Sequence, residues 1–487
     1  MSTTDVTTSA AESPEPTTEI SAQPRPTARN GLYALAMRLH FYAGVFVGPF
    51  ILVAAVTGAL YAISPTLESI VSRDLLTVAP AETSQPLSEQ VTAAVATQPD
   101  LPLVAVAPAA GAEDTTRVLF GDPSLGESER RAVFVDPHTA RPVGDCVVYG
   151  SSGALPLRTW IDRLHRDLHL GEPGRIYSEL GASWLWIVTL AGLVVWVRRV
   201  RGRRNHNSAG WLFAPDRTQN RRGRTLNWHG TVGMWVFPLA VLLSATGMSW
   251  STYAGATITE LREQLSWTTP EVSTALSGTA APTHDSGVHH DGAHAAPAMS
   301  DPADRIAQLD RVSEIARASG VIQPAEIVVP ATPSAAFVVK ERRMPGIYTV
   351  DAVAVDGSSG TVTDRLAYAD WPLMAKLTNW GIQFHMGLLF GLLNQLLLLA
   401  AMLGLITVIV RGYLLWWRRR PTREGGFPLG RAPRRGAWRK TTPWLLVPVL
   451  GGALVVGWFV PLVGLSLLAF LAVDLLIGVL GRVRAAA

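Results

Sequence analysis

Five of the eleven histidines lie where long apolar segments begin, and an imidazole in that position can bind a metal. His40 and His229 start two such segments, His165 and His169 come just before a third, and His385 starts a fourth. An ionisable side chain at membrane depth is costly and usually faces the interior of a helix bundle, where it has a function. A single histidine there is explained as a helix cap, but a set repeated along the chain indicates metal ligands.

The order of the segments places these histidines at two levels of a membrane, with two different spans contributing at each level. His40 and His229 fall at the cytoplasmic end, and His385 falls at the outer end together with His165 or His169. Zinc and copper sites need three or four close donors, whereas each level offers two imidazoles. Two axial imidazoles on opposite faces of a flat macrocycle are typical of six-coordinate haem. The pattern therefore predicts two haem groups.

Glycines and arginines beside the histidines are compatible with such a cofactor. Glycine within a turn of each histidine leaves room for a porphyrin, although ordinary close helix packing explains it equally well. These glycines are Gly44, Gly233, Gly171 and Gly387. Nearby guanidinium groups could pair with haem propionates, or anchor the chain at lipid headgroups instead. These arginines are Arg38, Arg163, Arg166 and Arg224.

Long uncharged stretches must position these residues, because several exceed the roughly 20 residues that a helix needs to cross a bilayer. The fold class expected is a polytopic α-helical membrane protein, with a duplicated four-helix haem-binding core, a C-terminal helical hairpin and α+β extracytoplasmic domains. We expect a disordered tail at 1–32, spans at 33–64, 175–199, 227–256 and 380–417, α+β domains at 65–165 and 257–376, basic loops at 200–226 and 418–442, and a hairpin of two further spans at 443–482.

Basic residues set the expected orientation. They concentrate before the first span and in the loops 200–226 and 418–442, which the positive-inside rule places in the cytoplasm with both chain termini. The net charge of +4 is thereby explained by topology, and no nucleic-acid partner is expected. The long segments between the spans then lie outside, and membrane lipid surrounds the spans.

The chain is predicted to be duplicated. When His40 is set on His229, four further pairs align without a gap. These pairs are Gly44 and Gly233, Pro49 and Pro238, Thr57 and Thr246, and Gly58 and Gly247. Later, "HLG" (169–171) parallels "HMG" (385–387), and "GLVVWVRR" (192–199) parallels "GYLLWWRR" (412–419). A repeat of this kind would also suit a transporter.

Two further features of the sequence bear on metal or redox chemistry. The insertion at 280–300 contains a short histidine tract that either gathers copper, zinc or iron or is a solvated linker. Its histidines are His284, His289, His290 and His294. The only cysteine, Cys146, excludes an internal disulfide, a cysteine-ligated iron–sulfur cluster and a CxxC redox motif.

Several motifs in order resemble the PepSY-associated membrane protein family over residues 33–420. They are "RLHRDLHLGEPGR" (163–175), "FHMGLLFG" (384–391) and "VFVDPHTARPVGD" (133–145), the last similar to a PepSY strand and turn. The resemblance implies a bacterial inner-membrane protein with PepSY-like outer domains and two b-type haems. It implies ligands at His40, His229 and His385, with His169 or His165 as the fourth. His169 is favoured because its "HLG" parallels the "HMG" of His385.

The expected function is transfer of electrons across the membrane to an outer acceptor. Electrons would enter at the His40–His229 level from a cytoplasmic protein or a quinol, since no GxGxxG motif follows a strand and the cytoplasmic loops are too short for a flavin or nicotinamide domain. The acceptor implied is a ferric siderophore or another metal chelate, which would make the protein a haem-dependent ferric-chelate reductase. The alternatives are a non-enzymatic membrane anchor that binds partner proteins, a transporter, and an accessory protein of copper or iron transport.

Overall fold

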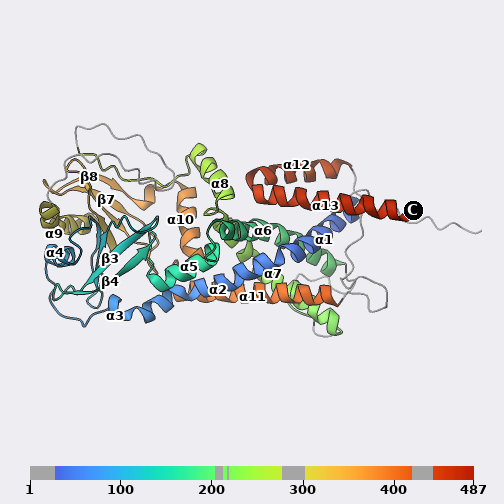
Figure 1. The fold of residues 1–487 in the computed structure, drawn as a ribbon, viewed down its shortest axis with the longest axis horizontal. Coiled ribbons are helices and arrows are strands. Elements are labelled where there is room, and N and C mark those ends of the chain that lie inside the picture. Colours follow the sequence, from blue (N-terminus) through green and yellow to red (C-terminus); the bar gives the residue numbers. More distant parts are fainter. Residues whose placement is uncertain (1–27, 203–211, 217–218, 277–301, 419–442, 487) are drawn as a thin grey trace, which may run out of the picture.

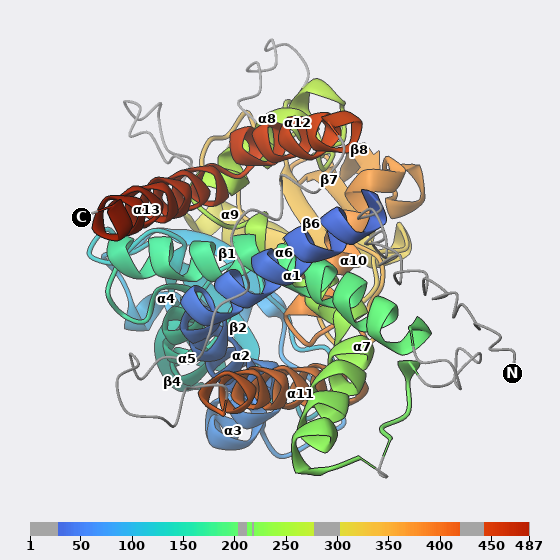
Figure 2. The same ribbon diagram turned by 90° about the vertical axis from the view of Figure 1, so that its right-hand side faces the viewer.

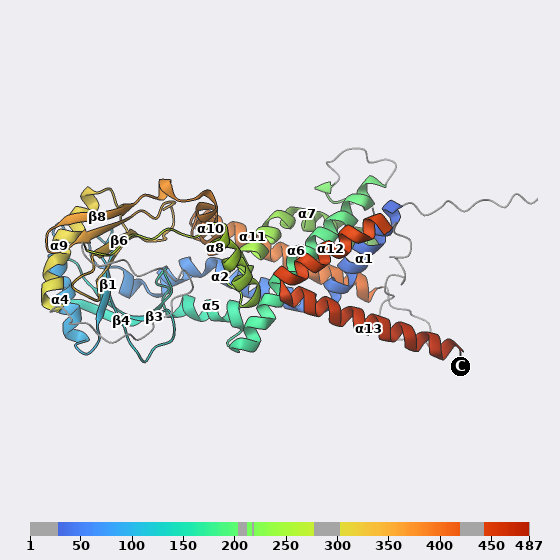
Figure 3. The same ribbon diagram turned by 90° about the horizontal axis from the view of Figure 1, so that it is seen from above.

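The computed structural model consists of a β-sheet part at one end and a helix bundle at the other (Figures 1 and 3). It describes residues 28–202, 212–216, 219–276, 302–418 and 443–486. The predicted tail therefore lies almost wholly outside the described residues, as do the histidines of the insertion. The sheet part contains the two long segments between the spans, and the bundle contains the apolar helices.

One continuous antiparallel sheet of eight strands is built from both long segments, in the order β4-β3-β2-β1-β5-β6-β7-β8. The first segment supplies β1 Leu103–Ala107, β2 Thr116–Phe120, β3 Glu129–Val135 and β4 Pro142–Tyr149. The second supplies β5 Ala325–Val328, β6 Phe337–Glu341, β7 Ala352–Asp356 and β8 Thr361–Leu366. The halves join where Ala105 of β1 pairs with Val328 of β5. This pairing leaves neither segment with an open inner edge, so the two expected domains share one sheet.

Two helices cover one face of the sheet, α4 (Leu87–Thr97) and α9 (Pro302–Ala318). They close over a core to which both halves contribute, with Val91, Phe120, Leu309 and Val355 almost inaccessible. Strand alternation sends Leu119 and its same-face neighbours to the opposite face, which is turned toward the helix bundle (Figure 3).

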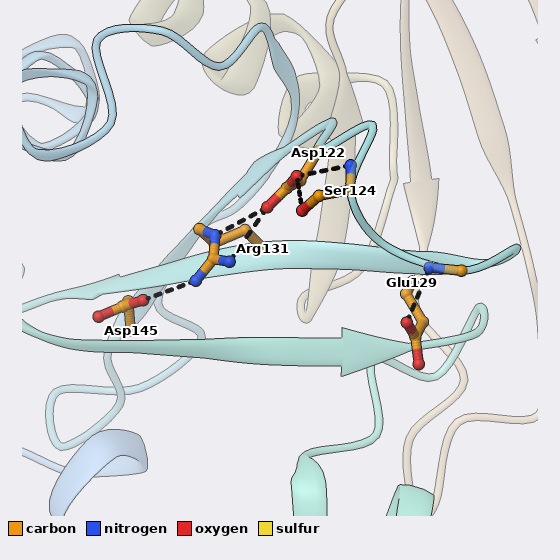
Figure 4. A network of polar contacts seen from close by, with 6 residues as sticks. Asp122, Ser124, Glu129, Arg131 and Asp145 are labelled. Carbon is orange, nitrogen blue, oxygen red and sulfur yellow. Dashed lines mark hydrogen bonds and ion pairs between the residues drawn. The ribbon is translucent and has the colours of Figure 1, made fainter.

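Charged side chains on β3 make polar contacts with the loop before it and with the neighbouring strand β4 (Figure 4). Arg131 bridges Asp122 (3.0 Å) and Asp145 (3.3 Å), while Asp122 also accepts from the Ser124 hydroxyl. Such exposed pairs contribute little stability individually. Glu129 on the same strand accepts from Arg163, which lies on α5 (Pro156–Asp167). This contact fixes a helix that carries one of the candidate histidines.

Five helices of the described chain are long and apolar enough to cross a membrane. They are α2 Gly48–Val71, α6 Glu172–Arg201, α7 Arg221–Met248, α11 Leu392–Trp417 and the part of α13 at 461–480. The sixth expected span is α12 (Pro443–Phe459), which has 17 residues. At 1.5 Å per residue that is about 25 Å, short of the roughly 30 Å of hydrocarbon. The hairpin is present, but the count of six full-length spans is not met.

The first predicted span is divided, because α1 (Ala28–Phe46) ends just before Val47 and α2 begins at Gly48. Pro49 lies in the first turn of α2, where its missing N–H costs nothing. The matching Pro238 lies inside α7, which continues through it. Remaining short helices are α3 Arg73–Leu76, α8 Tyr253–Gln264, α10 Leu373–His385 and the 3₁₀ turn η2 Tyr368–Asp370.

The C-terminal hairpin of α12 and α13 (Pro461–Ala486) lies at the edge of the bundle, with α13 against α6 and α12 over α8 (Figure 2). Two polar contacts attach it to the core. Asp474 lies 3.4 Å from the guanidinium of Arg38 on α1, and the indole N–H of Trp184 donates to the Ser466 hydroxyl (2.9 Å). Asp474, a charge within an apolar segment, is therefore paired.

Removal of Asp474 tests this attachment. We expect Asp474→Ala to lower the free energy of unfolding by about 1–3 kcal/mol, because it leaves the Arg38 charge uncompensated in a medium of low dielectric. Replacing both partners with apolar residues (Arg38→Met with Asp474→Leu) is expected to restore stability. Unfolding in mixed micelles, followed by tryptophan fluorescence, measures both. A double variant less stable than the single one would refute the pairing argument.

Candidate functional site

His40 of α1 and His229 of α7 meet at the end of the bundle remote from the sheet, and we call them the far pair. Their ring centroids lie 6.0 Å apart with planes at 69°. Neither helix alone could do this, since 189 positions separate the two residues (229 − 40). The four-helix packing of α1, α6, α7 and α11 brings them together.

A backbone carbonyl fixes the orientation of each far-pair ring. The Nδ1–H of His40 donates to the carbonyl of Val188 on α6 (2.9 Å), and that of His229 donates to the carbonyl of Val408 on α11 (2.9 Å). A carbonyl can only accept, so Nδ1 carries the proton and Nε2 keeps its lone pair. Metal-binding histidines are commonly held by such a bond from the second nitrogen.

Glycines make room for these rings and for a cavity beside them. A Cβ at Gly192, one turn after Val188, would lie 2.8 Å from Cε1 of His40, and one at Gly412 would lie 3.4 Å from Cε1 of His229. One turn after each histidine, a Cβ at Gly44 would meet nothing within 4 Å, and at Gly233 only Val408 at 4.0 Å. The rings line a cavity of about 270 Å³ whose other walls are almost wholly apolar.

His165 at the end of α5 and His385 at the end of α10 form a second pair, nearer the sheet, which we call the sheet-side pair. Their ring centroids lie 6.4 Å apart with planes at 46°. Tyr61 of α2 stacks on His165 at 6.0 Å, and Trp250 meets the His385 ring edge-on at 5.5 Å. Both rings thus lie in an aromatic layer between the bundle and the sheet.

Threonine hydroxyls orient the sheet-side rings. Thr57 lies 2.9 Å from Nδ1 of His165 and donates its own proton to the carbonyl of Val53, also at 2.9 Å. Thr246 lies 2.7 Å from Nδ1 of His385 and donates to the carbonyl of Leu242. A hydroxyl has one proton, so when that proton is donated to the backbone carbonyl, each oxygen accepts from Nδ1–H and Nε2 is left unprotonated. All four rings therefore present Nε2 as a lone-pair donor.

The residue whose ring faces His385 is His165 and not His169, which the sequence motif favoured over His165. α5 ends at Asp167, and the chain then turns through Leu168 and His169, both with φ of 55°. This left-handed turn directs His169 to the surface, where its ring lies 5.0 Å from that of Trp160. The similarity of "HLG" to "HMG" therefore does not identify the spatial counterpart of His385.

The two pairs meet the distance requirement of a metal held between two imidazoles. Rings bound through Nε2 at about 2 Å on opposite sides of one ion have centroids roughly 6 Å apart. Among the residues that the structure describes, no three His, Cys, Asp or Glu side chains gather around one ion position. The donor sets are thus two imidazoles each, which fits the axial positions of a haem iron, and the far pair adds an apolar cavity.

The pairs lie at opposite sides of the apolar layer. On α7, Thr246 follows His229 by 17 residues (246 − 229). At 1.5 Å per residue, the two levels are about 25 Å apart along the helix. This is close to the roughly 30 Å thickness of the hydrocarbon core of a bilayer.

Residues 37–419 match the model of the PepSY-associated TM region. The match spans well over half of the 487 residues and includes all four paired histidines. The chain belongs to the PepSY-associated transmembrane family. Comparison with curated proteins gives no match. Membership of this family, together with the apolar helices, identifies the chain as a multi-pass membrane protein.

In this PepSY-associated protein, three of the four arginines expected near a cofactor have protein partners. Arg38 pairs with Asp474, Arg163 with Glu129, and Arg166 with Tyr149 and Asp167. Arg224 is exposed in the first turns of α7. Of the glycines, Gly171 precedes α6, while a Cβ at Gly387 would meet the backbone oxygen of Ala62 at 3.0 Å. Neither lies against a paired ring.

Sequence reasoning missed the residues that hold the rings. In the sequence, Thr57 and Thr246 are only aligned positions of the two halves, and Gly58 and Gly247 follow them directly. A Cβ at Gly58 would lie 3.1 Å from Cε1 of His165, and one at Gly247 would lie 3.6 Å from Cε1 of His385. The repeated "TG" was therefore the available signal. Gly192 and Gly412 likewise open the two "G…W…RR" motifs.

The PepSY-associated protein has one thiol, and it lies in the sheet. Burial raises the pKa of Cys146 from 9.0 to about 11. At pH 8 the thiolate fraction, and with it the rate of maleimide labelling, is expected to be about 100-fold below that of an ordinary cysteine. The rate should rise about tenfold per pH unit toward pH 11. Labelling at the ordinary rate in the folded protein would contradict the burial of Cys146.

Proposed function

We propose that this protein transfers electrons across the membrane through two b-type haems, one held by each histidine pair. The electron donor is a cytoplasmic protein or a quinol, and the acceptor is a ferric siderophore or another ferric chelate on the opposite side. On this proposal the protein is a ferric-chelate reductase of iron uptake.

The observation that carries the proposal is the spacing of the four rings. Each pair has centroids near 6 Å and four hydrogen-bonded Nδ1 atoms leave every Nε2 available. Bound haem supplies one-electron redox chemistry at these positions. The four imidazoles would hold the two haems, and a haem held by two imidazoles would supply electron transfer rather than binding of a small ligand. The protein residues place the ligands and exclude water.

The orientation proposed puts the far pair toward the cytoplasm and the sheet outside, in a bacterial inner membrane with both termini cytoplasmic. In support, α6 ends in Arg198, Arg199 and Arg201, roughly two turns beyond Gly192, which lies against His40 of the far pair. The loop after α11 is equally basic in sequence. The positive-inside rule assigns such segments to the cytoplasm.

We also propose that the bundle arose by duplication. The support is that equivalent residues make equivalent contacts in the two halves. His40 binds a carbonyl of α6 as His229 binds one of α11, and Thr57 holds His165 as Thr246 holds His385. The strand order β4-β3-β2-β1 followed by β5-β6-β7-β8 has the same two-part arrangement.

A visible spectrum with pyridine haemochrome quantification tests the proposal. Full-length protein purified from haem-replete cells is expected to contain two haem b groups per chain. The variant with alanine at all four paired histidines controls for adventitious haem and should contain none. A colourless wild-type preparation would overturn the proposal and favour the membrane anchor that binds partner proteins.

Electron delivery is tested separately in sealed vesicles. With a reductant confined to the far-pair side and a ferric chelate on the sheet side, ferrous iron should form on the sheet side only. The four-alanine variant should give the rate of empty vesicles. If the protein contains two haems but no ferrous iron forms on the sheet side, the proposal of two haem sites stands and the proposal of a ferric-chelate acceptor is rejected.

Removal of the threonine that orients His165 should weaken that site without abolishing it. Thr57→Val keeps the shape but leaves Nδ1 without an acceptor, and loss of such a bond typically lowers metal affinity 10–100-fold, an order of magnitude expected here for haem. Haem titration of the apoprotein measures the change. Thr407→Val is the matched control, because the Thr407 hydroxyl of α11 donates to the carbonyl of Leu403 and has no other hydrogen-bond partner within the described part of the chain. Equal affinities in the two variants would show that Thr57 does not orient the ligand.

A further inference from the structure

A small cavity lies on the bundle-facing side of the sheet, at the junction of its two halves. Its volume is about 10 Å³, which is about the smallest that holds a single water molecule. Arg117 and Arg130 line it from the first half, and Glu326 and Arg342 line it from the second. Three guanidinium groups and one carboxylate therefore surround a space for one small particle.

The carboxylate is already neutralised by other cations. Glu326 lies 3.7 Å from Arg130 and 3.5 Å from Lys340, both on the same face of the sheet. Its two ion pairs do not include Arg117 or Arg342, although its charge also acts on Arg342 at longer range. The remaining positive charge of the cavity is not balanced by Glu326.

Arg117 and Arg342 have only backbone oxygens as hydrogen-bond partners in the part of the chain that the structure describes. Arg117 donates to the carbonyl of Gly153 (3.3 Å) and Arg342 to that of Ser152 (3.4 Å). A Cβ at Gly153 would lie 3.2 Å from Arg342 and 3.5 Å from Arg117, so the two like charges converge on one residue. The Nε of Arg342 is buried without a partner.

Such an arrangement is costly without a counter-ion. Glu68 of α2 acts electrostatically on both guanidinium groups, and Glu326 acts on Arg342 as well, but the Glu68 carboxylate already accepts from the Leu155 N–H (2.6 Å) and lies 3.9 Å from Arg158. Burial and the charge of Arg342 lower the pKa of Arg117 to about 10. Buried charges are normally paired, and here the free space lies between the unpaired ones.

We propose that this cavity binds a halide ion, chloride under ordinary conditions, between the guanidinium groups of Arg117 and Arg342. Size favours a monatomic anion. Chloride is larger than water, so the arginine side chains that line the cavity must move slightly to admit it, whereas sulfate, phosphate and carboxylate anions would need far more space. Leu119 and Val148 supply apolar wall, which suits a weakly hydrated monatomic anion. The ion would join the two halves of the sheet and the loop at 150–153.

The test compares thermal unfolding of the full-length protein in sodium chloride, bromide and gluconate at equal ionic strength. Chloride and bromide are expected to raise the Tm saturably by about 2–4 °C relative to gluconate, because ligand binding to the folded state stabilises it. Arg117→Gln and Arg342→Gln should lose this difference. Arg141→Gln, which removes an exposed arginine from the same half of the sheet, should retain it.

A second measurement uses wild-type protein alone, so it remains informative if Arg117→Gln and Arg342→Gln fail to fold. Wild-type protein should broaden the ³⁵Cl resonance of the solution, and bromide should reverse the broadening by competition. If wild type has the same Tm in all three salts, or causes no broadening that bromide reverses, the cavity holds water and the proposal is overturned. An equal halide effect in Arg117→Gln would place the ion elsewhere and overturn it as well.

Discussion

Alanine at His165 is expected to remove one of the two proposed haems from the purified protein, whereas alanine at His169 is expected to remove none. His165 lies 6.4 Å from His385 between ring centroids and is oriented by Thr57, while His169 lies at the surface beside Trp160. Pyridine haemochrome quantification should therefore give about one haem per chain for His165→Ala and about two for His169→Ala.

The two variants form a matched pair, since both remove one imidazole from the same 13-residue motif. His385→Ala should reproduce the spectrum of His165→Ala, because the loss of either ligand disrupts the same site. The double variant His165→Ala with His385→Ala should lose no more haem than either alone. Retention of both haems in His165→Ala with loss of one in His169→Ala would refute the pairing seen in the structure and restore the motif-based assignment.

A single methyl group at Gly192 is expected to remove the other haem. The added Cβ would lie 2.8 Å from Cε1 and 3.0 Å from Nδ1 of His40, so the ring must leave the position in which it bonds to Val188. Misplacement of an axial ligand by this amount breaks the far pair, while the sheet-side pair, about 25 Å away, keeps its geometry. Gly192→Ala should therefore contain about one haem per chain.

The glycines provide a graded series for this test. Gly412→Ala places its Cβ 3.4 Å from His229 and should have a milder effect, and Gly451→Ala on α12 meets nothing within 4 Å and should have none. Combining Gly192→Ala with His165→Ala identifies which site is lost, because the combination should contain no haem. Full haem content in Gly192→Ala would show that the far pair tolerates displacement of His40, and hence that it is not the ligand set.

Residue chemistry was enough to single out His40, His229 and His385. Each is an ionisable residue at the start of an apolar segment, where the cost of burial leaves few explanations besides function. The choice between His165 and His169 could not be made in the same way. That choice depends on the left-handed turn at Leu168 and His169, and no local sequence pattern predicts that α5 ends there.

The pairing of strands that are far apart in the chain could not be predicted from the sequence either. Each outer segment by itself has the alternation of a small α+β domain, and nothing in either one specifies that β1 pairs with β5 across more than 200 positions. The break in the first span was not predictable either, because the sequence stays apolar across Val47, where α1 and α2 are separated. Composition reports burial, whereas partner choice depends on how several elements pack at once.

The amino-acid sequence by itself determined the membrane class, the apolar helices, the family and three of the four paired histidines, because hydrophobicity and the cost of buried ionisable groups are local properties. Only the tertiary structure decided that His165 faces His385, that Val188, Val408, Thr57 and Thr246 orient the rings, and that both outer segments share one sheet. These features require atoms from helices and strands far apart in the chain to meet within a few ångströms, and that proximity exists only after the chain has packed.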